Sequence, residues 1–194
     1  MKVEEKKIVT VGQMTKELIG GFFLNGIVIG IIYSIIYGLI MSKVETNNYT
    51  IIIIITLILQ AISIIAIWKL NVQERFKKKT ILKKDSKLLI RNLIIFTVVI
   101  WVISAIYAYN KANNAFEEEI ENSPEIQYQE RFIEMLYDED KKAEYYIQKQ
   151  KVIDEAKSEL NTYIAFLEIG ILVIYLGSML IVKKDINKKA LEVN

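Results

Sequence analysis

Four blocks of apolar residues interrupt an otherwise polar chain. They cover Ile19–Met41, Thr50–Leu70, Leu89–Tyr109 and Asn161–Val182. Each block is close to the roughly 20 residues that a helix, rising 1.5 Å per residue, needs to cross the hydrocarbon layer of a bilayer. The pattern predicts an all-α membrane protein with four transmembrane helices, arranged as a four-helix bundle.

Lysine and arginine are concentrated in three segments, and this sets the predicted orientation. The segments are the N-terminal arm 1–18, the connection 69–91 and the tail 183–194, whereas the short connection 42–49 holds only Lys43. Because basic segments stay on the cytoplasmic side, we expect both termini and the 69–91 loop to be cytoplasmic. The basic residues of the loop are Lys69, Arg75, Lys77, Lys78, Lys79, Lys83, Lys84, Lys87 and Arg91.

The connection 110–160 has the opposite charge and is predicted to lie outside. It carries fourteen acidic residues against seven basic ones. Ser123-Pro124-Glu125 is a favourable helix start, since serine caps, proline fits the first helical position and glutamate suits the helix dipole. We expect a helix near 124–138, a continuation of the third span over 110–122, and overall an acidic extracytoplasmic helical hairpin between spans three and four.

The N-terminal arm contains one weaker helix signal. Thr10 and Gln13 have the spacing of a capping box, in which each residue caps a backbone N–H of the other. The pattern predicts a short interfacial helix that carries Val11, Met14 and Leu18.

The chain contains no cysteine and no histidine. Thiol nucleophiles, disulfides, Ser-His-Asp triads and zinc sites built on thiolate or imidazole are therefore excluded. The sequence also lacks nucleotide-binding loops and the ordered carboxylates of a calcium loop. We predict no catalytic residue, no cofactor and no metal site, and hence a protein that is not an enzyme.

Glu168 is an ionisable residue seven positions into the fourth apolar block. Such a group is costly within a bilayer and is a candidate functional site by default. It either binds a proton, a cation or a polar headgroup, or only fixes helix packing through a hydrogen bond. The polar residues that we expect near it, on the same face or at matched depth, are Tyr175, Tyr33, Tyr37, Thr56, Gln60 and Ser104.

Small residues recur every fourth position along the first apolar block, at Gly26, Gly30, Ser34 and Gly38. Such a stripe lets two helix backbones approach closely in lipid. It predicts helix packing, either against another span of the same chain or in a homo-oligomer.

The basic 69–91 loop is predicted to meet anionic lipid headgroups, because each basic residue near a membrane surface adds to that attraction. Nucleic-acid binding is not expected, since no stacking platform accompanies the charge. The apolar residues of this loop that we expect to enter the membrane interface are Phe76, Ile81, Leu82, Leu88 and Leu89.

The sequence favours a non-catalytic integral membrane protein, an accessory or interaction subunit of a membrane or envelope complex. The alternative is a small oligomeric transporter or channel that uses Glu168 as a proton or cation site. A chain of four spans with a single membrane carboxylate is small for a transporter, which favours the first interpretation. The wealth of isoleucine, lysine and asparagine is typical of an AT-rich bacterial genome, so we expect the cytoplasmic membrane of a bacterium.

Overall fold

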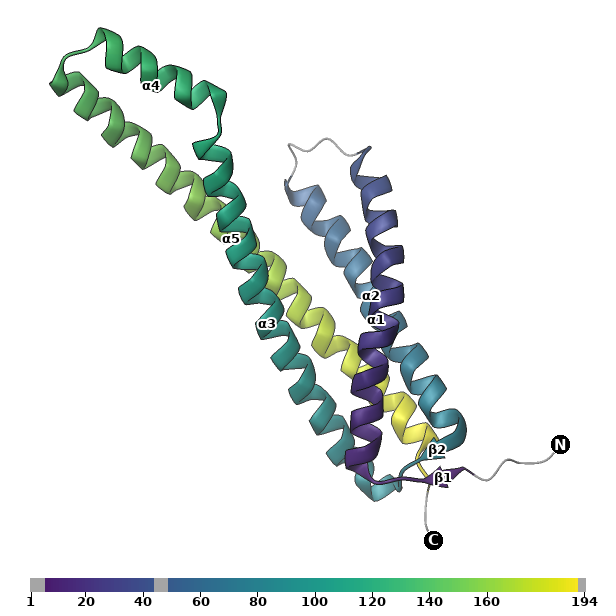
Figure 1. Cartoon of the computed structure of the whole chain (residues 1–194). Coiled ribbons are helices and arrows are strands. Elements are labelled where there is room, and N and C mark those ends of the chain that lie inside the picture. Colours follow the sequence, from purple (N-terminus) through teal and green to yellow (C-terminus); the bar gives the residue numbers. More distant parts are fainter. Residues whose placement is uncertain (1–5, 44–48, 192–194) are drawn as a thin grey trace. The chain divides into compact units, whose positions relative to one another are not determined.

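The computed structural model describes residues 6–43 and 49–191. Within them, four helices are long and apolar enough to cross a membrane: α1, α2, α3 and α5. These four helices confirm the prediction of an all-α, multi-pass membrane protein. Most of the 42–49 connection lies outside the described residues. The elements in chain order are β1 (Lys7–Ile8), α1 (Val11–Met41), α2 (Tyr49–Lys78), β2 (Lys79–Thr80), the 3-10 helix η1 (Lys83–Asp85), α3 (Ser86–Glu121), α4 (Pro124–Leu136) and α5 (Glu139–Lys189) (Figure 1).

The helices extend well beyond the apolar blocks. Helix α2 continues past Leu70 to Lys78, and α5 is 51 residues long. Residues 69–91 contain no glycine or proline that would break a helix. Arg75, Lys77 and Lys78 lie in the last turn of α2, where positive charge stabilises the exposed carbonyl end. The predicted basic loop is therefore mostly the end of one helix and the start of the next.

Two helices begin at the capping residues that the sequence predicts, Ser123 and Thr10. Ser123 accepts a hydrogen bond from the backbone N–H of Ile126, and Pro124 opens α4. Thr10 likewise accepts from the backbone N–H of Gln13. The Gln13 side chain bonds to Glu17 instead of returning to Thr10, so the capping box is only half formed. Helix α1 then runs from Val11 to Met41 without the break expected between an interfacial helix and the first span.

The described chain forms two compact units. Unit 1 comprises Met1–Trp101 and Ile169–Asn194, and unit 2 comprises Val102–Glu168. The buried core belongs to unit 1, where the aromatic rings of Phe22 and Trp68 lie 4.8 Å apart and those of Phe22 and Phe96 lie 5.6 Å apart. Its fully buried hydrophobic residues include Met14, Leu18, Val72, Phe76, Ile81, Leu89, Leu93 and Ile186.

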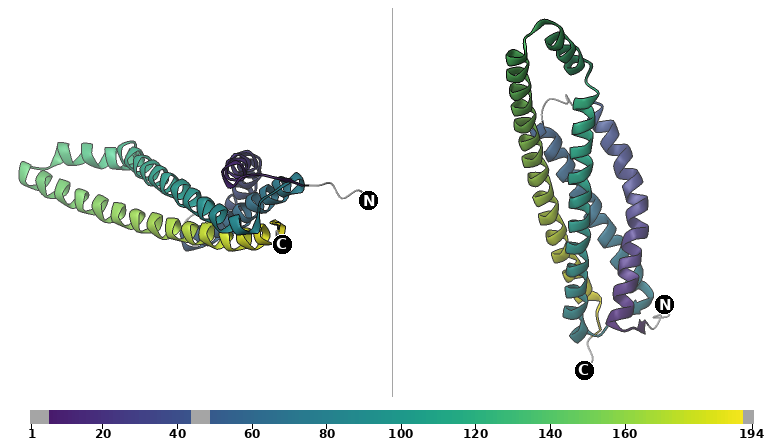
Figure 2. Two further views of the ribbon diagram at one scale, coloured as in Figure 1. Left: turned by 90° about the horizontal axis from the view of Figure 1, so that it is seen from below. Right: turned by 60° about the vertical axis from the view of Figure 1, so that its left-hand side comes forward.

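The three basic segments meet at one end of unit 1 (Figures 1 and 2). Strand β1 pairs in parallel with β2, with Lys7 opposite Lys79 and Ile8 opposite Thr80. The Thr80 hydroxyl donates to the carbonyl of Lys189, and Leu191 bonds through its backbone to both Ile81 and Lys83. The N-terminal arm, the 79–83 segment and the end of α5 are thus joined by hydrogen bonds. We did not predict this pair of two-residue strands from the sequence, because such short strands leave no pattern.

Candidate functional site

The residues predicted to surround Glu168 are divided between the two units. Glu168 is half-buried on α5 in unit 2, and Ser104 is exposed on α3 in the same unit. The five remaining members belong to unit 1. The polar cluster around Glu168 therefore stays a prediction.

Within unit 1, two of the polar residues predicted to lie near Glu168 contact each other, Tyr33 and Tyr37. The rings of Tyr33 and Tyr37 stack with centroids 5.7 Å apart and an angle of 11° between their planes. Thr56 donates to the carbonyl of Ile52 in its own helix, and Gln60 is half-buried on α2. Tyr175 lies in the buried core, where its carbonyl accepts from the Ser178 hydroxyl.

The stripe of small residues on α1 is open. A Cβ added at Gly26, Gly30 or Gly38 would meet no described atom within 4 Å. The Ser34 hydroxyl bonds to the carbonyl of Gly30 in the same helix. The described part of the chain thus offers this stripe no packing partner, and its role in helix packing stays a prediction.

The close helix approach lies instead at Gly21, which the sequence did not single out. An added Cβ there would lie 2.0 Å from the side-chain oxygen of Asn71 on α2. Asn71 is fully buried, and its amide nitrogen donates to the carbonyl of Leu18. Among the described hydrogen bonds, this bond from Asn71 is the only one that joins α1 and α2. A glycine at position 21 leaves the space that the Asn71 side chain needs.

The apolar residues of the 69–91 segment correct one expectation. Phe76, Ile81 and Leu89 were expected at the membrane interface but are buried in the core of unit 1. Leu82 is half-buried, and only Leu88 is exposed. Three of these five apolar side chains thus belong to the core of unit 1 instead of the membrane interface.

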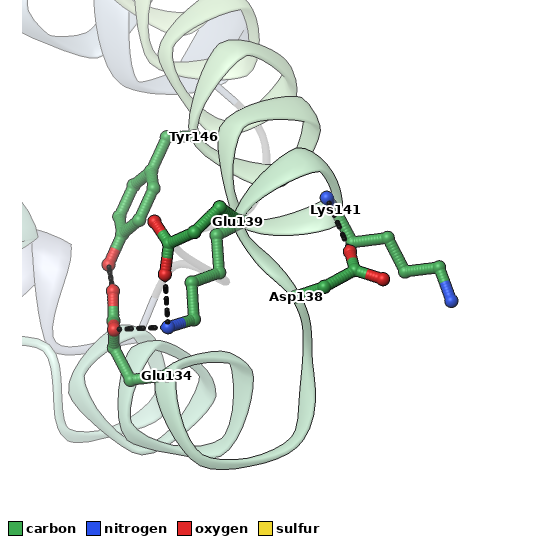
Figure 3. Close-up of polar contacts among 6 residues, drawn as sticks. Glu134, Asp138, Glu139, Lys141 and Tyr146 are labelled. Atoms are coloured by element: carbon green, nitrogen blue, oxygen red, sulfur yellow. Dashed lines mark hydrogen bonds and ion pairs between the residues drawn. The ribbon is translucent and has the colours of Figure 1, made fainter.

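Unit 2 is held together by polar contacts between helices. Lys142 on α5 pairs with Glu134 of α4 at 3.2 Å and with Glu139 at 3.1 Å, and the Tyr146 hydroxyl donates to Glu134 at 3.0 Å (Figure 3). Lys149 pairs with Glu130 one turn further along. Helix α4 is thus attached along the start of α5 by two lysine–glutamate pairs and one tyrosine hydroxyl.

The same contacts change the acidity of Glu134. The hydrogen bond from Tyr146 and the hydrogen bond from Lys142 lower the pKa of this carboxyl from its ordinary value of 4.5. Since both partners favour the charged form, the contacts that Glu134 makes with α5 are stronger when this carboxyl is ionised.

Contacts between α3 and α5 complete unit 2. Lys157 pairs with Glu117 at 2.6 Å, and the Asn113 amide donates to the side-chain oxygen of Asn161 at 3.2 Å. The acidic side chain of Glu117 thus takes part in the fold, and among the described residues no three acidic side chains converge to hold a metal ion.

One face of α4 has no partner in unit 2. Tyr128, Phe132 and Met135 fall at helical spacing on this face, hereafter the α4 face, and are 71%, 44% and 76% exposed. Ile126 and Ile133, on the opposite face, are half-buried. The side chains that attach α4 to α5 therefore leave Tyr128, Phe132 and Met135 exposed to the surroundings of unit 2. We did not predict the α4 face from the sequence, although the helical spacing of its three residues is visible there.

Comparison of this chain with protein-family models, with curated proteins and with solved structures found no match.

Proposed function

We propose that this chain is a non-catalytic membrane protein that acts as an interaction subunit, docking a protein partner on the α4 face. The single observation that carries the proposal is the exposure of Tyr128 and Met135 on a helix fixed by ion pairs. A contiguous exposed apolar patch with a polar surround is typical of a protein-binding surface. Aromatic residues and methionine are enriched in such interfaces.

The orientation proposed from the sequence places this face outside the cell. The meeting of three basic segments at one end of unit 1 supports their lying on one side of the membrane, which the positive-inside rule makes the cytoplasm. Helix α3 continues twelve residues beyond Tyr109 to Glu121, about 18 Å at 1.5 Å per residue. Helix α4 then stands clear of the bilayer as part of an extracytoplasmic hairpin.

The charge of the region defines the chemistry of the partner. Acidic residues outnumber basic residues fourteen to seven over 110–160. A complementary surface is an apolar groove with a basic rim, because opposite charge around a hydrophobic centre favours encounter and register.

A photo-cross-linking residue placed at Tyr128 tests the proposal in native membranes. We expect a cross-link to one protein of different mass, and at least a tenfold loss of that cross-link when Phe132 and Met135 are both changed to serine, since a few residues at the centre of an interface carry most of its binding energy. The matched control places the cross-linker at Val152, which is 65% exposed on α5 outside the α4 face.

Equal cross-linking from both positions would contradict a specific docking face. A product made only of two copies of the chain would contradict the interaction-subunit role and favour the oligomeric transporter.

A further inference from the structure

A cleft opens in unit 1 between the beginning of α3 and the end of α5. Its volume is about 810 Å³, within the range of roughly 300–1,000 Å³ that is usual for small-molecule sites. The two walls come from segments almost a hundred residues apart in sequence. At one end the cleft meets η1, so it lies beside the basic end of unit 1.

The end of the cleft next to η1 is strongly cationic. Its basic residues are Lys83, Lys84, Lys87, Arg91 and Lys183, and no carboxylate is among the described residues that line it. Lys87, Arg91 and Lys183 form no salt bridge within the described chain. Several uncompensated positive charges around one opening favour an anion there. The N-terminus of α3, at Ser86, adds the positive end of its helix dipole.

The rest of the cleft is apolar. Ile94 and Ile95 form the α3 wall, and Leu176 and Leu180 form the α5 wall. Along α5, Leu176 lies seven residues from Lys183, about 10 Å at 1.5 Å per residue. The cleft therefore changes from cationic to hydrophobic along the direction in which these helices cross the membrane. A soluble anion would use only the cationic end.

We propose that this cleft binds one anionic glycerophospholipid. The phosphate lies among Lys87, Arg91 and Lys183, and an acyl chain follows the hydrophobic walls into the bilayer. Basic pockets between transmembrane helices at the cytoplasmic surface are suited to such headgroups. The inference rests on the four-span placement in the membrane and is independent of the partner proposed for the α4 face.

Native mass spectrometry of the full-length protein in mild detergent provides the test. The purified protein is titrated with phosphatidylglycerol or with phosphatidylcholine, and bound lipids are counted. We expect one phosphatidylglycerol to be retained per chain, in preference to phosphatidylcholine. The cleft variant Lys87→Gln/Arg91→Gln/Lys183→Gln should bind it at least tenfold more weakly, because each lost charge removes part of the headgroup attraction.

The matched control variant, Lys77→Gln/Lys78→Gln/Lys184→Gln, removes the same charge from exposed residues outside the cleft. It should bind phosphatidylglycerol as the unmodified protein does. Equal weakening in both triple variants would overturn the inference, since it would show attraction by overall charge alone.

A third variant separates a lipid site from a phosphate site without changing any charge. Leu180→Trp fills the apolar part of the cleft and should abolish retention of phosphatidylglycerol. Retention by Leu180→Trp, together with displacement of the lipid by millimolar inorganic phosphate, would overturn the proposal in favour of a simple phosphate site. The cross-link at Tyr128 is measured separately, so either proposal can fail alone.

Discussion

At Gly21 the backbone of α1 comes so close to the Asn71 side chain of α2 that a single hydrogen atom fits where other residues carry a side chain. The buried Asn71 amide uses this space to donate to the Leu18 carbonyl. A polar bond between helices in an apolar environment fixes both the register and the rotation of the pair. Leu18, Phe22 and Val72, which are next to this contact in sequence or take part in it, belong to the buried core of unit 1.

Substituting Gly21 by alanine should therefore destabilise the protein. The new Cβ would displace the Asn71 side chain and break the hydrogen bond from its buried amide nitrogen to the Leu18 carbonyl, which costs about 1–3 kcal/mol. We expect a clearly lower melting temperature in detergent, followed by circular dichroism.

Gly30→Ala is the matched control, since an added Cβ there meets nothing within 4 Å. It should leave the melting temperature unchanged or slightly raised, because alanine favours a helix over glycine. Equal melting temperatures for the two variants would show that the Gly21–Asn71 contact contributes nothing.

Between elements, the attachment of α4 to α5 depends on pH. Hydrogen bonds from Tyr146 and Lys142 lower the pKa of Glu134 below 4.5. A lowered carboxyl pKa stabilises the folded contact above the ordinary value, and this contribution is lost as the pH falls through the folded value. Helix α4 should thus be held at neutral pH and loosened in acid.

Spin labels at Gln129→Cys and Gln150→Cys, one on each helix, report this attachment through their distance distribution. We expect a narrow distribution at pH 7 that broadens as the pH falls below the ordinary value of 4.5 and then through the lowered pKa of Glu134. Glu134→Gln should broaden the distribution already at pH 7. A distribution that stays narrow in acid in the unmodified protein would refute the role of Glu134.

Helices and their caps could be predicted because the signals are local. The apolar blocks identified all four spans, and Ser123 with Pro124 marked the start of α4. Helix ends were less predictable, since Lys78 ends α2 where the apolar block had already stopped at Leu70. A helix needs no apolar residues to continue beyond a membrane.

Contacts between distant segments could not be predicted in the same way. Whether Gly21 or Gly30 faces the Asn71 side chain depends on how α1 is rotated against α2. The two glycines look alike in the sequence. The basic cleft likewise needs α3 and α5 side by side, although the charge of Arg91 and Lys183 was evident. The candidate site at Glu168 was identified from chemistry alone, so its surroundings remain a prediction.

For the whole molecule, charge and structure support one arrangement. Three basic segments are joined at one end of unit 1, and the acidic residues of 110–160 belong to unit 2. Both proposals use the orientation that we propose from these charges, with a protein partner of α4 outside the cell and an anionic lipid at the basic end of unit 1. The side of the membrane on which α4 and the basic end of unit 1 lie is therefore the first property to measure.

Labelling of single cysteines tests this orientation, because the natural chain contains none. Gln129→Cys in α4 and Lys78→Cys at the end of α2 are expressed separately in whole cells and treated with a membrane-impermeant maleimide. We predict labelling of Gln129→Cys in intact cells, and labelling of Lys78→Cys only after the membrane is permeabilised. Labelling of Lys78→Cys in intact cells, with Gln129→Cys protected, would contradict the account.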